Sequence, residues 1–359
     1  MSPTRLQRLR SSLPQHRLDF LLVNHLPNIR YLTGFTGSAG VLAISRQESV
    51  FVTDGRYSEQ AREQVREGKV LIAPKAPLVA AAEWFKARVR GKATVGIEGA
   101  HLSVADRDRV AAQLPKKFRI RSAPALVEEQ RMIKDSAEIA LIRKAVRSGS
   151  DLFEDILKAV RPGVQETAVA AQVEYAARKR GCEGMSFETI IASGPRSALP
   201  HGRASDQRIP RRGFVVCDFG VILAGYCSDM TRTLYVGRAD KQARSFYQAV
   251  RDAQLSGIEA VRPGVPVSEV DAAARRVLKK AGLGRYFTHS AGHGVGLEIH
   301  EAPRVASGQS EILRPGMVIT IEPGAYVPRK WGVRVEDMVV VTERGCEVLT
   351  PTTKELICI

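Results

Sequence analysis

Two acidic residues, Asp218 and Asp229, stand within the apolar stretch FVVCDFGVILAGYCSDMTRTL at residues 214–234 and are the first candidates for chemistry in this sequence. The β-rich runs around them flank a predicted turn at residues 223–225, a pattern typical of a hairpin. Residues equidistant from such a turn face each other with Cβ atoms about 5 Å apart. Two ionised carboxylates this close repel each other unless a cation lies between them. The stretch therefore predicts half of a metal site.

A duplicated segment predicts where the other half of this site lies. The hexapeptide AVRPGV occurs at residues 159–164 and again 101 residues later, at 260–265. Each copy precedes a stretch of helical pattern that ends in glycine, at Gly181 and at Gly282. The common spacing indicates an internal duplication. It predicts a second hairpin with acids between about residues 317 and 341.

The second hairpin is present as MVITIEPGAYVPRKWGVRVEDMVVV, with Glu322 and Glu336 placed symmetrically about a predicted turn at residues 328–330. Between the two hairpins lies the glycine-rich stretch SAGHGVGLEIHEAP, residues 290–303, which contains His293. A single histidine is more often structural than a ligand. Here the surrounding glycines allow the close approach of backbone and side chain that a crowded centre needs. We therefore add His293 to the candidate ligands.

The candidate ligands are four carboxylates and one imidazole: Asp218, Asp229, His293, Glu322 and Glu336. Four negative charges would neutralise two divalent ions, and carboxylates can bridge a metal pair about 3.5–4 Å apart. Oxygen-rich ligation suits Mn²⁺, with Co²⁺ and Zn²⁺ as alternatives. A water bridging the ions would be acidified to a hydroxide nucleophile, which predicts metal-assisted hydrolysis. Each acid alone could instead be a turn or edge residue, but the shared symmetry favours the metal site.

Length and composition indicate an ordinary globular protein with two domains. The 359 residues exceed what one core usually holds, and hydrophobic and charged residues make up 44% and 26% of the chain. No apolar run approaches the ~20 residues that cross a bilayer, and the N-terminus lacks a signal-peptide pattern. The five cysteines form no CxxC pair, which argues against a disulfide framework or a thiolate zinc site and favours a cytoplasmic protein.

The formal net charge of +16 is the unusual feature of the composition. Clustered basic residues can bind nucleic acid. Here Arg and Lys are scattered, with small groups at residues 208–212 and 275–280, and no zinc finger or aromatic RNA-binding motif accompanies them. We interpret the charge as solvated surface and expect no nucleic-acid partner.

Two domains are predicted, at residues 1–125 and 126–359. In the first, LDFLLV, VLAIS, SVFVTD and TVGIEG are predicted strands, and residues 59–66 and 80–90 are predicted helices, which is an α/β pattern. In the second, Asp135 and Glu138 have the spacing of a capping box and are expected to open a long amphipathic helix.

Motifs along almost the whole chain resemble those of one enzyme family. They are NIRYLTGFTGSAG at 28–40, RMIKDSAEIALIRKA at 131–145, SFETIIASGPRSALPHG at 186–202, CSDMTRT at 227–233, HGVGLEIHE at 293–301, IEPGAY at 321–326 and VRVEDMVVV at 333–341. The chain resembles the pita-bread metallopeptidases, and among them the Xaa-Pro peptidases, aminopeptidase P and prolidase. This resemblance implies a creatinase-like N-terminal α/β domain, followed by an α+β pita-bread catalytic domain with an internal pseudo-twofold duplication.

The resemblance also implies a role for each candidate ligand. Asp229 and Glu336 would bridge the two metal ions. Asp218 would complete the shell of one ion, and His293 and Glu322 that of the other. Glu322 would in addition accept a proton from the attacking water, as a general base does.

Further roles follow from the same resemblance. His201, His289 and His300 match the family positions that hold the substrate and stabilise the tetrahedral intermediate and the leaving proline. Arg334 matches an arginine that contacts the substrate or supports the ligands, and Tyr326 lies where a hydroxyl group supports them. No organic cofactor is implied.

The implied activity is a metal-dependent exopeptidase that cleaves the bond before proline in peptides. We favour an Xaa-Pro aminopeptidase over the alternative, an Xaa-Pro dipeptidase, because the GFTGSAG type of N-terminal domain and the compact length resemble the short bacterial aminopeptidases. Two other activities of this fold are disfavoured. Methionine aminopeptidase lacks a large N-terminal domain, and creatinase lacks the acid set that this chain retains. A non-catalytic basic binding protein of the same fold is a further alternative. The family also implies a homodimer.

Overall fold

The computed structural model describes residues 3–359, and the chain forms two compact units, Met1–Arg131 and Met132–Ile359. The predicted domain boundary after residue 125 falls just before helix α6 (Leu126–Met132). Within the described part of the chain, no helix has both the length and the apolar character needed to cross a membrane.

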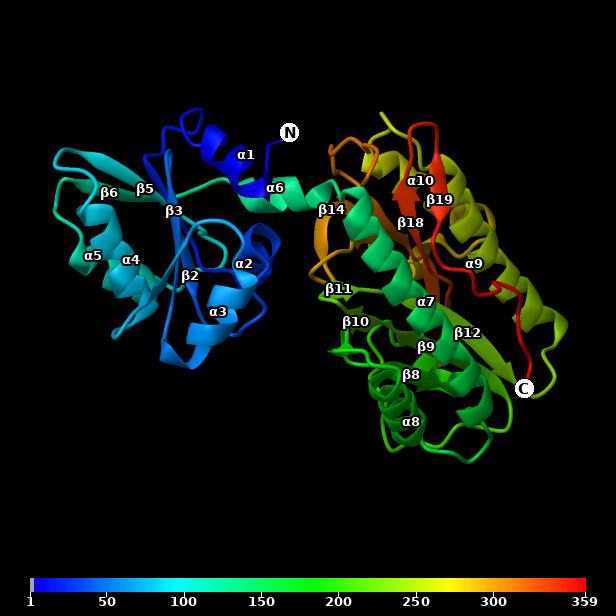
Figure 1. Cartoon of the computed structure of the whole chain (residues 1–359). Helices are drawn as coiled ribbons and strands as arrows, with labels where there is room; N and C mark the ends of the chain where they lie inside the picture. The colour runs from blue at the N-terminus through cyan, green and yellow to red at the C-terminus, as the bar shows by residue number, and fades with distance from the viewer. Residues whose placement is uncertain (1–2) are drawn as a thin grey trace. The chain divides into compact units, whose positions relative to one another are not determined.

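The first unit is an α/β layer with one mixed sheet (Figure 1). Its strands are β1 (Phe20–Val23), β2 (Val41–Ser45), β3 (Ser49–Thr53), β4 (Lys69–Ile72), β5 (Ala93–Ile97) and β6 (Phe118–Ser122). Its other helices are α1 (Arg5–Ser12), α2 (Leu26–Thr33), α3 (Ser58–Gln64), α4 (Pro77–Lys86) and α5 (Val104–Gln113). The strand order is β4-β3-β2-β1-β5-β6. All four predicted strands are present, whereas β4 and β6 were not predicted.

The helices of the second unit confirm the predicted duplication. They are α7 (Ser136–Ala159), α8 (Glu166–Lys179), α9 (Lys241–Ala260) and α10 (Val267–Lys280), so that α10 repeats α8 at both ends with an offset of 101 residues. Asp135 caps α7 as predicted, because its side chain accepts a hydrogen bond from the Glu138 amide and the Glu138 side chain accepts one from the Asp135 amide. Figure 1 shows these helices around the strands of the unit.

The strands of the second unit form four small sheets. They are β7 (Gly184–Met185), β8 (Ile190–Ser193), β9 (Gly213–Phe219), β10 (Val221–Leu223), β11 (Tyr226–Cys227), β12 (Met230–Val236), β13 (Gly292–Gly294), β14 (Glu301–Val305), β15 (Val318–Ile321), β16 (Gly324–Val327), β17 (Trp331–Arg334), β18 (Asp337–Val341) and β19 (Cys346–Val348). The sheet orders are β12-β9-β8, β11-β10-β7, β14-β13-β15-β18-β19 and β16-β17.

The centre of the first hairpin lies one residue beyond the predicted position. Asp218 pairs with Thr231, and the tip is the dipeptide Ala224–Gly225, with φ values of +51° and +82°. Positive φ at both positions is the signature of a two-residue type I′ turn. The prediction that Asp218 and Asp229 face each other directly is therefore wrong. Because Asp229 stands two residues before Thr231, the two acids are instead diagonal neighbours on one face.

The second hairpin has the predicted register. Ile321 pairs with Asp337 in the β15–β18 ladder, and Gly324 pairs with Arg334 in the β16–β17 ladder. Glu322 and Glu336 therefore lie opposite each other, at the point where the β15–β18 pairing ends and the β16–β17 pairing has not yet begun. A break in the ladder frees both acids to turn toward the interior of the unit.

Candidate active site

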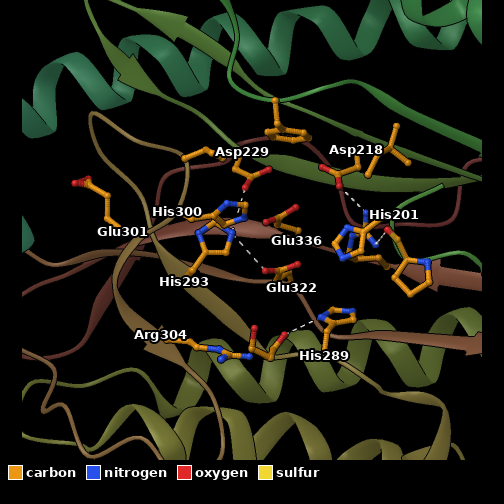
Figure 2. Close-up of a pocket in the computed structure, with 16 residues that line it drawn as sticks. His201, Asp218, Asp229, His289, His293, His300, Glu301, Arg304, Glu322 and Glu336 are labelled. Atoms are coloured by element: carbon orange, nitrogen blue, oxygen red, sulfur yellow. Dashed lines mark hydrogen bonds and ion pairs between the residues drawn. The ribbon is translucent and has the colours of Figure 1, made fainter. Parts of the chain in front are cut away.

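A cavity of about 550 Å³ in the second unit is lined by all nine predicted catalytic and ligand residues. They are His201, Asp218, Asp229, His289, His293, His300, Glu322, Arg334 and Glu336. Figure 2 shows Asp229, Glu322 and Glu336 between the pair of rings of His293 and His300 and the pair of His201 and His289. The geometry thus brings together residues that are more than a hundred positions apart in the sequence.

The centre of the cavity has the donor chemistry of a metal site. Asp229, His293 and Glu336 each offer a ligand atom, and these atoms lie within 4.8 Å of one another. His293 Nε2 is 3.6 Å from Asp229 Oδ2 and 3.5 Å from Glu322 Oε1. Asp218 Oδ1 and Glu336 Oε1 are buried, and no group in residues 3–359 donates a hydrogen bond to them. Buried carboxylate oxygens without donors are what a bound cation would satisfy, so the residues fit divalent metal ions.

The protonation states of the acids reflect their crowding. Burial raises the pKa of Glu322 to about 8, with the Asp218 charge adding to the effect. Burial, followed by the charges of neighbouring acids, also raises the pKa of Asp229 and of Glu336 well above the ordinary range. These carboxylates are therefore unstable as anions without positive charge between them.

His293 is neutral, and the strand that carries it fixes its ring. Burial lowers its pKa to about 4, and its Nδ1 lies 3.0 Å from the Gly294 carbonyl oxygen. Nδ1–H therefore donates to the backbone, which leaves the Nε2 lone pair facing the acids. A Cβ at Gly292 would lie 1.9 Å from the Thr320 carbonyl oxygen, so only glycine permits this approach of the strands.

Arg334 contacts four residues of the site. Its guanidinium lies 2.5 Å from Asp218 Oδ2 and 2.6 Å from the Tyr326 hydroxyl group, both on Nη atoms. It also donates to the Pro200 carbonyl oxygen and to Thr231 Oγ1, each at 3.0 Å. The arginine thus links the first hairpin, the second hairpin and the chain segment before His201.

His289 is fixed at both ring nitrogens. Its Nδ1 lies 2.8 Å from the Ser290 carbonyl oxygen and its Nε2 lies 3.0 Å from the Tyr326 hydroxyl group. Burial lowers the pKa of His289 to about 4, and the Arg334 charge adds to this effect. A neutral ring that donates from Nδ1 accepts the Tyr326 proton at Nε2. His289 is therefore oriented by the same tyrosine that Arg334 contacts.

The other two predicted histidines lie at the wall of the cavity. The His300 ring centroid is 4.4 Å from that of His293, and burial lowers the pKa of His300. His201 is exposed on the loop between the short 3₁₀ helix 194–198 and strand β9, and it lines the same cavity. Both rings are thus available to a substrate bound beside the acids.

Two functional side chains were missed by the sequence analysis. Thr231 Oγ1 donates to Glu336 Oε2 at 2.7 Å and so orients this acid. It could have been found, because the alternation of a strand places it on the face of Asp229. Arg304 lines the cavity and lies directly across from His293 in the β13–β14 pair. This pairing continues that of Gly292 with Val305, and the register shifts only after His293. No local sequence signal identifies the pairing.

Two family models match the chain. The model of metallopeptidase family M24 matches residues 140–343, and the model of the creatinase/prolidase N-terminal domain matches residues 5–133. The first contains every candidate site residue, and the second covers the mixed six-stranded sheet.

Relatives with known structures or names extend over nearly the whole chain. The structure of an Xaa-Pro dipeptidase from Bacillus anthracis is 40% identical, covers 99% of each chain and has a TM-score of 0.95. An Xaa-Pro dipeptidase from Pyrococcus horikoshii is 38% identical over 96% of each chain. The structure of an X-Pro aminopeptidase from Thermotoga maritima is 32% identical, covers 98% of this chain and 100% of its own, and has a TM-score of 0.89.

Proposed function

This chain belongs to metallopeptidase family M24, and we propose that it hydrolyses the peptide bond before proline in Xaa-Pro dipeptides. The observation that carries the proposal is the convergence of three buried acids, the half-buried Glu322 and a neutral histidine in one cavity that also presents Arg304. Membership of the family implies divalent metal ions. Similarity to two Xaa-Pro dipeptidases at 38% and 40% identity supports the substrate class.

We assign the metal ligands from the donor set. Asp229 and Glu336 are proposed as ligands shared by two ions, Asp218 as a ligand of one, and His293 and Glu322 as ligands of the other. Mn²⁺ is the first candidate, because four of the five donors are carboxylates. Divalent ions held by these residues would supply an acidified water as nucleophile and would polarise the scissile carbonyl group.

The remaining side chains bind the substrate and move protons. Glu322 would accept a proton from the attacking water on its carboxylate and deliver it to the proline nitrogen as the bond breaks. His300 and His201 donate to the oxygen of the scissile carbonyl group as negative charge develops there. The apolar side chains of Phe187, Ile190 and Ile299 also line the cavity and exclude water from the ring of the substrate.

Arg304 favours a dipeptide over a longer peptide. Its side chain is exposed toward the cavity (Figure 2), and no acid among residues 3–359 forms an ion pair with it. A guanidinium group in this position pairs best with a carboxylate. In an Xaa-Pro dipeptide the proline carries a free carboxylate, whereas in a longer peptide it continues as an amide. The sequence alone favoured an aminopeptidase, and the structural similarity to an X-Pro aminopeptidase keeps this activity as the second candidate.

The test is hydrolysis of Xaa-Pro and Xaa-Pro-Xaa peptides by metal-stripped protein before and after addition of Mn²⁺, Co²⁺ or Zn²⁺. We expect metal-restored cleavage of the dipeptide and slow cleavage of the tripeptide. Equally fast cleavage of the tripeptide would establish the aminopeptidase instead. Absence of cleavage with every metal would contradict both activities.

The variant Arg304→Met tests the assignment of the carboxylate partner. A hydrogen bond to a charged group is worth about 1.5–3 kcal/mol, so R304M should raise KM for the dipeptide by roughly 10- to 100-fold and leave the tripeptide unaffected. Arg314→Met is a matched control, because Arg314 is an exposed arginine paired with Glu311 and does not line the cavity.

A further inference from the structure

Glu166 is a buried acid that lines no part of the catalytic cavity. It is the first residue of α8, and none of its surface is exposed. A buried carboxylate is stable only where hydrogen bonds or a positive charge compensate for its lost hydration. The groups that compensate Glu166 therefore show which part of the molecule it holds.

Every side-chain contact of Glu166 leads to one segment of the chain. Oε1 accepts hydrogen bonds from the amide and the hydroxyl group of Ser193, both at 2.8 Å. Oε2 accepts from the amide of Ser205 at 3.2 Å, from its hydroxyl group at 2.8 Å, and from Arg196 Nε at 3.0 Å. One carboxylate thus clamps both ends of the segment 193–205, and His201 lies on this segment.

The middle of the segment is held as well. Arg196 Nη2 donates to the Arg203 carbonyl oxygen at 2.6 Å, which extends the grip of Glu166 to within two residues of His201. On the opposite flank, Arg334 donates to the Pro200 carbonyl oxygen at 3.0 Å. His201 is exposed and has no side-chain hydrogen bond within the described structure, so its place at the cavity depends on how its backbone is held.

The second half of the duplication contains a similar arrangement around another histidine. Asp271 on α10 is fully buried and accepts from the Ala291 amide at 3.0 Å and from Arg275 Nε at 2.6 Å. Arg275 in turn donates to the carbonyl oxygens of Phe287 and His289. In each half, a buried acid near the start of the second helix holds a histidine-bearing loop with the help of an arginine.

We propose that Glu166 is a positioning residue that holds His201 in the geometry used by the substrate. This inference rests on the proposed function of the cavity. Groups that orient catalytic side chains typically change activity by about 10- to 100-fold when they are removed, and a displacement of about 1 Å can have an effect of this size. Glu166→Gln replaces one acceptor oxygen by a donor, so the five hydrogen bonds to the segment cannot all form.

A double-mutant cycle separates positioning of His201 from a general structural role. Glu166→Gln alone should lower kcat/KM for an Xaa-Pro dipeptide by about 10- to 100-fold, with unchanged metal affinity. In the His201→Ala background, E166Q should change kcat/KM by no more than about twofold, because its effect acts through the missing ring. A full loss in that background would overturn the proposal. The control is a second cycle that combines Asp271→Asn with His201→Ala. In this cycle the effects of the two substitutions on kcat/KM should be close to additive.

Hydrogen exchange of the metal-stripped protein gives a readout that does not need activity. Amides of residues 194–205 should exchange faster in E166Q, while peptides from α9 and from the first unit keep their rates. Unchanged exchange in 194–205, or an increase spread over the whole second unit, would contradict the proposal. If wild-type protein cleaves no Xaa-Pro peptide, the proposed function fails, and this exchange measurement still decides the positioning role.

Two milder variants keep the test open if E166Q does not fold. Ser205→Ala removes one hydroxyl donor, and Arg196→Met removes the guanidinium group, while both leave the buried carboxylate in place. Each should raise exchange in the same segment and lower kcat/KM less than E166Q does. If neither variant raises exchange in this segment or lowers kcat/KM, Glu166 is not the residue that positions His201.

Discussion

Arg334 and Asp218 form an ion pair in which the nitrogen and oxygen atoms are 2.5 Å apart and only 4% and 11% of the side chains are exposed. Because the same guanidinium also contacts Tyr326 and the Pro200 carbonyl group, this pair fixes the position of one candidate metal ligand relative to His289 and His201. The ion pair therefore contributes both to the folding stability of the unit and to the position of a candidate metal ligand.

Arg334→Met should destabilise the metal-stripped protein by about 3–5 kcal/mol, because it leaves the Asp218 carboxylate buried without its partner. Urea unfolding of the stripped protein measures this change. The double variant R334M/D218N removes both charges and should recover part of the loss without recovering metal affinity. Equal stability of R334M and wild type would show that the ion pair does not stabilise the site.

Removal of either shared ligand should abolish metal binding and activity together. For Asp229→Asn and Glu336→Gln we expect a loss of kcat/KM greater than about 100-fold, since loss of merely supporting groups already has an effect of about 10- to 100-fold. Calorimetric titration with Mn²⁺ checks the binding. The stripped variants should be at least as stable as stripped wild type, because a neutral amide avoids the free-energy cost that the raised pKa of the buried acid represents.

The control for these ligand variants is Glu343→Ala, which removes an exposed acid of the same unit. It should bind Mn²⁺ and turn over substrate as wild type does. Retention of full Mn²⁺ affinity in D229N or E336Q would show that the assigned ligand is not one.

The stability of the stripped protein should fall as pH rises from 6.5 to about 8. In this window Glu322, whose pKa burial raises to about 8, keeps its proton in the folded state and has lost it in the unfolded state. The folded state therefore binds more protons, and the free energy of unfolding decreases with pH, by up to about 1.4 kcal/mol per pH unit for each such group. Asp229 and Glu336, whose pKa values are also raised, act in the same direction.

Below pH 6.5 the buried histidines act in the opposite direction. Burial lowers the pKa of His289 and of His293 to about 4, so stability they contribute is lost as pH falls from 6.5. The melting temperature of stripped protein should thus be measured between pH 6.5 and 8, where the raised pKa values of the three acids outweigh the remaining titration of the histidines in the unfolded state. Glu322→Gln should flatten the slope, and a saturating divalent metal should remove it. A melting temperature that rises across this window would contradict the assignment.

Arg232 stabilises the second hairpin through Asp337, and its removal should lower the free energy of unfolding. It pairs with Asp337 at 2.7 Å with 2% and 0% of the side chains exposed, and it donates to the carbonyl oxygens of Thr352 and Thr353. Arg232→Met should lower the free energy of unfolding by about 3–5 kcal/mol. The control Arg143→Met breaks an exposed pair with Glu347 and should change it by less than about 1 kcal/mol.

The sequence alone predicted the four acids that line the cavity, because the duplication carries register information. The AVRPGV repeats predicted helices that recur at an offset of 101 residues, and the structure confirms them. The second hairpin has the predicted centre, whereas the first is displaced by the turn at Ala224–Gly225. Alanine at φ +51° is uncommon, so a sequence pattern does not place the turn between these two residues.

Contacts that depend on long-range packing were beyond sequence reasoning. Arg304 lines the cavity from its position across from His293 in the β13–β14 pair, and such a cross-strand pairing has no local signature in the sequence. Glu166 holds groups 27 and 39 residues away in the chain. The hydrogen bonds that Ser193 and Ser205 donate to the Glu166 carboxylate can be identified only from the three-dimensional structure of this segment.

The positions of the two hairpins in the sequence mean that the candidate metal site can be completed only late in the synthesis of the chain. The candidate ligands are drawn from both halves of the duplication, and the last of them in the sequence is Glu336. A nascent chain that ends before this residue holds at most four of the five groups. On the proposed assignment, the metal site stays incomplete until residue 336 has been synthesised, so the earlier part of the chain cannot hold both ions as the full chain does.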